Sequence, residues 1–118
     1  NGLSELLKTL PEDQEINILD IGCGDGEMLR KCAQFAQRKG YSINCIGIDF
    51  NPNIIAMAKA KSIAYPNISF QTKDVFSIEN SIPNCDIALA TLFMHHFSNE
   101  KIMTLLTEEQ RKKLIVQN

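Results

Sequence analysis

Short apolar runs bounded by turn residues recur along the chain and predict β-strands. The clearest is 16–21, in which Ile18, Leu19 and Ile21 form a nearly continuous run that is typical of a parallel strand covered on both faces. Residues 68–72 instead alternate apolar and polar side chains, which predicts a strand nearer the edge of a sheet. The remaining runs predict strands over 43–48 and 85–91 and the beginning of another at 114–116.

The segments between these strands place apolar residues at helical spacing. One helix is expected from about 26 to 39, with Gly40 as its C-terminal cap. The next is expected from Pro52 to about Ile63, with Asn51 as its N-terminal cap. The same spacing predicts further helices at residues 3–10 and 98–113.

Strand and helix alternate throughout, which predicts an α/β fold with a doubly wound, mainly parallel sheet and helices on both faces. A chain of 118 residues with 44% hydrophobic residues can bury the core of one domain. In sheets of this kind, ligands bind at the carboxyl ends of the strands, where the strand order reverses. The residues that stand out chemically follow predicted strands: Gly22–Gly26, Asp49, Asp74 and the stretch from Thr91 onward.

Three alternating glycines, Gly22, Gly24 and Gly26, come directly after the first strand. Glycine adopts positive φ angles and allows a ligand to approach the main chain closely. The helix that follows would point its free N–H groups and the positive end of its dipole at the turn. This arrangement predicts a cradle for a ligand with a negative or polar group; the alternative is a tight strand–helix turn without a ligand.

The spacing of the glycines limits which ligand fits. A dinucleotide fingerprint needs a third glycine at the position of Glu27, where a carboxylate would repel a pyrophosphate, so NAD and FAD are disfavoured. A phosphate-binding P-loop needs Gly-Lys-Ser/Thr, which the sequence lacks.

The net charge and the composition limit the classes of binding partner that are expected. The net charge of −2 and the pI near 5.6 argue against a surface that neutralises nucleic-acid phosphates. No run approaches the length of a transmembrane helix and no signal-peptide pattern is present, so no membrane partner is expected. These features favour a cytoplasmic protein.

The four cysteines form no C-x-x-C pair, so a metal site is not expected. Cys32, Cys45 and Cys85 lie in apolar segments and are interpreted as buried, reduced thiols, which suits a cytoplasmic location. Cys23 lies within the glycine turn. It is interpreted as a small turn residue, with a reactive nucleophile as the alternative, although no partner base is apparent.

The pattern Asp20-Ile-Gly-Cys-Gly-Asp-Gly26 resembles the first motif of the class I S-adenosylmethionine-dependent methyltransferases. Asp20 would brace the turn or bond the ammonium group of the cofactor's methionine moiety. Asp49, at the end of the second strand, could accept hydrogen bonds from both ribose hydroxyls. Phe50 either covers one face of the adenine or packs in the core.

Later segments resemble further motifs of the same family. Lys73-Asp74-Val75-Phe76 is similar to the third motif, in which Asp74 would accept from the adenine amine and the Val75 N–H would donate to a ring nitrogen. The stretch from Cys85 through Thr91 to Phe97 is similar to the fourth motif, in which the Thr91 carbonyl would bond the cofactor ammonium. The expected cofactor-binding residues are Asp20, Gly22, Cys23, Gly24, Asp49, Phe50, Asp74, Val75, Thr91 and Leu92.

His95 and His96 follow the fourth predicted strand in a His-His-Phe sequence that is similar to small-molecule and ubiquinone-type methyltransferases. One of them is a candidate general base, and packing or helix entry is the alternative. Adjacent histidines usually point in different directions, so they are not expected to share a metal.

The resemblance covers about Leu3 to Val116 and implies S-adenosylmethionine-dependent methyl transfer to an unidentified small-molecule acceptor. The alternatives are a non-catalytic domain that binds S-adenosylmethionine or a nucleoside and a nucleotide-dependent oxidoreductase. Family members continue through further C-terminal strands, so residues 1–118 are expected to be one incomplete methyltransferase domain. Its open sheet edge at 114–116 would favour self-association, giving a possible homo-oligomer.

Overall fold

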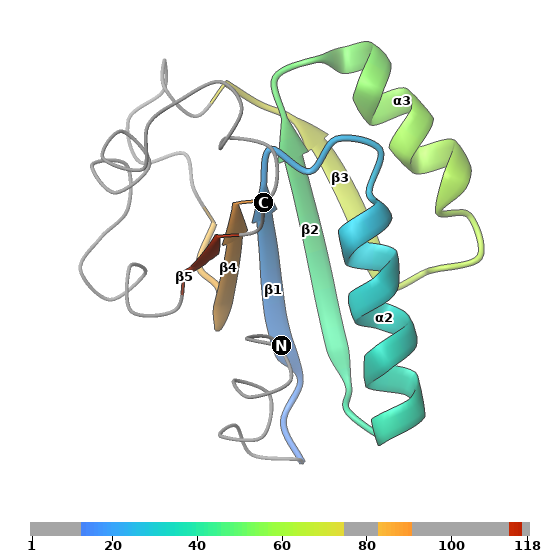
Figure 1. Cartoon of the computed structure of the whole chain (residues 1–118), viewed down its shortest axis with the longest axis vertical. Coiled ribbons are helices and arrows are strands. Elements are labelled where there is room, and N and C mark those ends of the chain that lie inside the picture. The colour runs from blue at the N-terminus through green and yellow to red at the C-terminus, as the bar shows by residue number, and fades with distance from the viewer. Residues whose placement is uncertain (1–12, 75–82, 91–113, 117–118) are drawn as a thin grey trace.

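The computed structural model describes residues 13–74, 83–90 and 114–116 of the chain. In chain order its elements are β1 (Ile16–Ile21), α2 (Glu27–Lys39), β2 (Ile43–Asp49), α3 (Pro52–Lys61), β3 (Ile68–Thr72), β4 (Ile87–Ala90) and β5 (Leu114–Val116) (Figure 1). The helices expected at 3–10 and 98–113 lie outside the described residues.

The strands form one sheet in the order β3-β2-β1-β4-β5, and every neighbouring pair is parallel. This confirms the predicted mainly parallel α/β architecture of the Rossmann-like type. Strand β3 lies at an edge, as its alternating pattern predicted. Successive strands run outward from β1 to β3 on one side, and β4 then pairs with the other side of β1. The strand order therefore reverses beside β1, which is where a ligand site is expected.

Helices α2 and α3 both cover the same side of the sheet (Figure 1). They connect β1 to β2 and β2 to β3, two steps in the same direction across the sheet. Because such connections are right-handed, both helices fall on one face. The remaining expected helices lie in parts of the chain that are not described.

Helix α2 has the ends that the sequence predicted. It begins after Gly26 and ends at Lys39, and Gly40 follows with φ 78° and donates its N–H to the Ala36 carbonyl. A left-handed residue directly after a helix is most easily supplied by glycine. The buried face of α2 consists of Leu29, Cys32, Ala33 and Ala36.

Helix α3 begins as predicted but ends earlier than the expected Ile63. The Asn51 side chain accepts from the N–H groups of Asn53 at 2.9 Å and Ile54 at 3.3 Å, which caps the helix. At the other end Ser62 donates its N–H to the Lys59 carbonyl, and its own carbonyl accepts from Tyr65. This turn directs the chain toward β3 and leaves Ile63 exposed.

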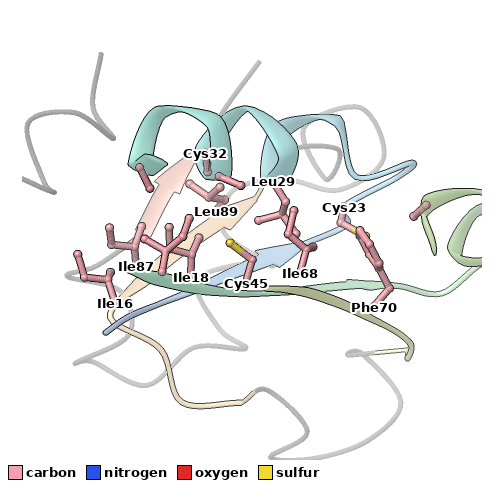
Figure 2. Packing of buried hydrophobic residues seen from close by; sticks show 14 of the residues in the cluster. Ile16, Ile18, Cys23, Leu29, Cys32, Cys45, Ile68, Phe70, Ile87 and Leu89 are labelled. Carbon is pink, nitrogen blue, oxygen red and sulfur yellow. The ribbon is translucent and has the colours of Figure 1, made fainter. Parts of the chain in front are cut away.

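The core lies between the sheet and the two helices, and Figure 2 shows its central side chains. Ile18 of β1 lies opposite Cys45 of β2 and Ile87 of β4. Leu19 and Ile21 lie on the face of β1 opposite to Ile18 and are also buried. Burial on both faces of β1 is what its continuous apolar run predicted.

The segment before β4 corrects two expectations. The strand begins at Ile87 instead of Cys85, and Cys85 is half-buried instead of buried. Asp86 explains the later start, because its carboxylate accepts the Asn17 N–H at 2.8 Å while its own N–H donates to the Asn17 carbonyl at 2.8 Å. These two hydrogen bonds hold Asp86 beside the beginning of β1. The regular pairing of β4 with β1 starts at the next residue, Ile87. Cys32 and Cys45 are buried as expected.

Across the part of the chain that the structure describes, no helix combines the length and the apolar character needed to cross a membrane.

Candidate functional site

The glycine turn lies at the carboxyl end of β1, beside the reversal of strand order. Gly22, Gly24 and Gly26 have φ angles of 75°, 56° and 85°. All three are in the left-handed region, which residues with a Cβ rarely adopt. The alternation of glycines is therefore required by the path of the backbone.

The N–H groups of the turn are mostly used inside the protein, which corrects the expectation of a free N–H cradle. The N–H groups of Gly22 and Cys23 both donate to the Ile48 carbonyl, at 2.8 and 3.0 Å. The Gly26 N–H donates to the Cys23 carbonyl at 3.1 Å. The first N–H of helix α2, that of Glu27, donates to the Asp25 carboxylate at 3.1 Å. A phosphate would have to displace these bonds, so the turn is poorly suited to bind one.

Asp49 connects the end of β2 to the glycine turn. Its Oδ2 accepts the Gly24 N–H at 3.1 Å, and its Oδ1 accepts the Asn51 N–H at 3.0 Å. The residue is only 8% exposed. A carboxylate offers about four lone-pair positions, so two bonds leave acceptor capacity for a ligand's hydroxyl groups.

Asp20 is completely buried, at 0% exposure, near the end of β1. It lies opposite Gly47 of β2 and Leu89 of β4 in the sheet and has a partner within the protein. A charged group at this depth is costly unless it is paired. Its position agrees with a role in bracing the turn.

Cys23 is a buried turn residue whose side chain lies beneath the glycine turn. Burial raises the pKa of its thiol, and the negative charges of Asp20, Asp49 and Asp25 raise it further. The thiol therefore stays protonated, which argues against the nucleophile alternative. The same effect places the carboxylates of Asp20, Asp49 and Asp25 near the Cys23 thiol.

Phe50 and Asp74 lie on the exposed side of this region. Phe50 is 63% exposed, so the alternative of a core aromatic is wrong. The Lys73 N–H donates to the Asp49 carbonyl at 2.8 Å, so the backbone next to the exposed Asp74 lies beside the end of β2. Both residues are accessible to a ligand at the strand ends.

Five of the expected site residues cannot be placed from the structure. Val75, Thr91, Leu92, His95 and His96 lie outside the described residues. Among the residues that are described, no group of three or more histidine, cysteine or acidic side chains could hold a metal ion.

The structure also shows a packing contact beneath the turn that the sequence analysis missed. The ring of Phe70, on β3, lies close enough that a Cβ on Gly26 would be 2.7 Å from its Cζ, and a Cβ on Gly47 would be 2.8 Å from its Cδ1. A Cβ on Gly47 would also lie 2.9 Å from the Cys23 sulfur. Figure 2 shows Cys23 and Phe70 side by side. A glycine inside the strand 43–48 was the available signal, because it often marks a close approach.

A second missed feature is a polar network at the start of α2. The Asp25 carboxylate accepts from Lys61 at 2.9 Å, and the Asp25 carbonyl accepts from an Arg30 guanidinium nitrogen at 2.7 Å. The hydrogen bond from Lys61 is the largest cause of the lowered pKa of Asp25. Arg30 and Lys61 gave no signal of their own in the sequence, because cations at these helix positions usually face solvent.

Comparison with known proteins identifies a family that matches most of the chain. The family model of the methyltransferase domain matches residues 18–112. The non-reducing polyketide synthase mapC of Penicillium roqueforti is 28% identical over 109 residues, which cover 82% of this chain and 4% of that synthase.

Two solved structures illustrate the similarity of the fold. The citrinin polyketide synthase CMeT domain has 27% identity and a TM-score of 0.65, over 75% of this chain and 24% of that chain. The phosphoethanolamine N-methyltransferase 1 of Haemonchus contortus, solved with phosphoethanolamine and S-adenosylhomocysteine, has 18% identity and a TM-score of 0.63, over 97% of this chain and 23% of that chain. The chain thus spans a minor part of each of these relatives. With the family model matching most of its length, it belongs to the methyltransferase domain family and is a class I S-adenosylmethionine-dependent methyltransferase domain.

Proposed function

We propose that this domain binds S-adenosylmethionine at the carboxyl ends of β1, β2 and β3, and that the protein transfers the methyl group to a small-molecule acceptor. The observation that carries the proposal is the junction of Asp49 with the glycine turn. One buried carboxylate fixes the turn through the Gly24 N–H and retains acceptor capacity for a nucleoside ribose. Family membership supports the choice of S-adenosylmethionine as that nucleoside.

The charge of the site fits this ligand better than a dinucleotide. S-adenosylmethionine carries a positive sulfonium and an ammonium besides one carboxylate, and Asp20 and Asp49 lie near the turn, whereas Asp25 is paired with Lys61 and Arg30. Opposite charges attract more strongly where water is partly excluded. A pyrophosphate would meet these carboxylates and would find the turn's N–H groups already bonded. A nucleotide-dependent oxidoreductase is therefore less well supported.

Four described residues of the site have a proposed role toward the cofactor. Asp49 accepts from the ribose hydroxyls, the exposed ring of Phe50 covers the adenine, and Asp74 accepts from its amine. Asp20 braces the turn and adds negative charge toward the ammonium group. For Val75, Thr91 and Leu92 the contacts implied by the family resemblance remain predictions.

The protein's proposed part in the reaction is to position the reactants. When bound, S-adenosylmethionine supplies a methyl group that its sulfonium already activates toward nucleophiles. The residues of this chain would hold the adenosine portion, orient the methyl group toward the acceptor and limit the access of water. A general base is needed only if the acceptor must lose a proton, and His95 or His96 remain candidates for that role.

The relatives support a small-molecule acceptor without naming it. One solved neighbour is the CMeT domain of a polyketide synthase, and another contains phosphoethanolamine. A polyketide or another small metabolite is therefore the proposed acceptor class. Cytoplasmic location and self-association through the sheet edge also remain proposals.

Calorimetric titration tests the cofactor directly. S-adenosylhomocysteine should bind with one-to-one stoichiometry, and NAD should give no heat at the same concentration. Binding of NAD with no binding of S-adenosylhomocysteine would contradict the proposal. Methyl transfer from labelled S-adenosylmethionine to a panel of small molecules, assayed with the full-length protein, then separates an enzyme from a non-catalytic binding domain.

A further inference from the structure

The segment from Asp49 to the end of helix α3 contacts the glycine turn twice, once from each end of the segment. At the beginning, the Asp49 carboxylate accepts the Gly24 N–H at 3.1 Å. At the far end, the Lys61 ammonium donates to the Asp25 carboxylate at 2.9 Å. Two consecutive residues of the turn are therefore held by opposite ends of one helical segment.

Arg30 joins the same two elements from α2. One guanidinium nitrogen donates both to the Asp25 carbonyl at 2.7 Å and to the Ser62 hydroxyl at 2.9 Å, and the other lies 3.7 Å from the Asp25 carboxylate. The Arg30 side chain is 14% exposed, and Ser62 is buried. The guanidinium therefore ties the backbone of the turn to the residue that ends α3.

We propose that Arg30, Lys61 and Ser62 are positioning residues that set the affinity for the cofactor by holding Asp25, and with it the glycine turn, against the end of α3. The inference rests on the proposed function, because it assumes that the ligand binds at this turn. None of the three residues is among the expected cofactor contacts, so they act through Asp25.

The flanking glycines explain why Asp25 needs holding. Gly24 and Gly26 lie on either side of it with φ angles of 56° and 85°, and glycine has access to more backbone conformations than any other residue. Without the three contacts, the Asp25 peptide can adopt conformations that the ligand does not fit. The apparent affinity then falls in proportion to the fraction of molecules in the competent conformation.

The sharpest test compares two lysines on the same helix. Lys61 binds Asp25, whereas the side chain of Lys59 forms no hydrogen bond or ion pair with another described residue. Lys61→Met and Lys59→Met remove the same charge from the last turn of α3. The readouts are the Kd of S-adenosylhomocysteine by calorimetry, well below the melting temperature, and the melting temperature of the unliganded protein.

We expect Lys61→Met to weaken S-adenosylhomocysteine binding about three- to fivefold, the upper range for a half-exposed ion pair. Lys59→Met should stay within about twofold, and neither variant should change the melting temperature by more than a few degrees. Arg30→Gln should weaken binding more, by about tenfold, and Arg30→Lys should restore part of the affinity. Asp25→Asn combined with Lys61→Met should be no weaker than Asp25→Asn alone, since both act through one pair.

The outcomes separate the two hypotheses. If the wild-type protein fails to bind S-adenosylhomocysteine, the proposed function is overturned and this inference falls with it. If the wild type binds, but Lys61→Met and Lys59→Met have equal affinities, the positioning role is overturned and the proposed function stands. If Arg30→Gln lowers the melting temperature but leaves the affinity unchanged, Arg30 contributes to stability only, and its positioning role is likewise overturned.

Discussion

The glycines at the two ends of helix α2 offer a matched pair of substitutions. Gly26 precedes the helix with φ 85° and Gly40 follows it with φ 78°, so alanine at either position is held in the same backbone region. A Cβ on Gly26 would lie 2.7 Å from Phe70 Cζ and 3.0 Å from an Arg30 guanidinium nitrogen, whereas one on Gly40 would have nothing within 4 Å. The pair therefore separates backbone strain from steric overlap.

The left-handed conformation costs a residue with a Cβ about 1–2 kcal/mol. Overlap in a packed core adds about 1–3 kcal/mol. Gly40→Ala should thus lower the free energy of unfolding by about 1–2 kcal/mol, and Gly26→Ala by about 2–5 kcal/mol. Urea unfolding followed by circular dichroism measures both, provided that the m-values match that of the wild type.

A third substitution identifies the cause of the difference. Phe70→Leu removes the ring atoms that a Cβ on Gly26 would overlap, so Gly26→Ala should cost less in the Phe70→Leu background than in the wild type. Gly26→Ala should also weaken S-adenosylhomocysteine binding, because the turn must move, while Gly40→Ala at the distant end of α2 should not. Equal stability losses at the two glycines, or an equal cost of Gly26→Ala in both backgrounds, would refute the packing argument.

Three further predictions concern the site and the buried thiols. Asp49→Ala should weaken S-adenosylhomocysteine binding by about 1–3 kcal/mol in calorimetry, because the ribose loses a charged acceptor; unchanged affinity would show that the ribose assignment is wrong. Phe50→Ala should weaken binding by about 0.5–1.5 kcal/mol without lowering the melting temperature, since the ring is exposed, and Phe50→Tyr should bind normally. Burial raises the pKa of Cys32 and of Cys45 to about 12, so the native state keeps protons that the unfolded chain releases, and the free energy of unfolding should fall as the pH rises above about 8.5. Cys45→Ala should flatten that decline in urea titrations between about pH 8 and 10.

The sequence predicted the elements well where one local rule controls the structure. The apolar run of 16–21 gave the bounds of β1, and Gly40 and Asn51 cap their helices as expected. These features depend on side-chain periodicity and on the backbone preferences of single residues. Neighbouring residues in the sequence therefore suffice to predict them.

The sequence predicted less where the outcome depends on which groups meet across the fold. The N–H groups of the glycine turn looked available, but Ile48 at the end of β2 and Asp49 beside it accept three of them. Helix α3 looked longer, but Ser62 leaves the helix and accepts a hydrogen bond from Arg30. In both cases a partner that is distant in the sequence takes part, and no local pattern identifies such a partner.

The glycine turn is consequently organised by the protein more than by its ligand. Its N–H groups are bonded to Ile48, Cys23 and Asp49, and the side of the turn that faces the core packs on Phe70. A turn that is already ordered loses little conformational freedom when a ligand arrives, which favours binding. Gly26 admits the Phe70 ring beneath the turn. This is a close-packing role like that of the third glycine of a dinucleotide site, although that fingerprint places its third glycine one position later, at Glu27. The same alternation of glycines is therefore compatible with the proposed cofactor without forming a phosphate site.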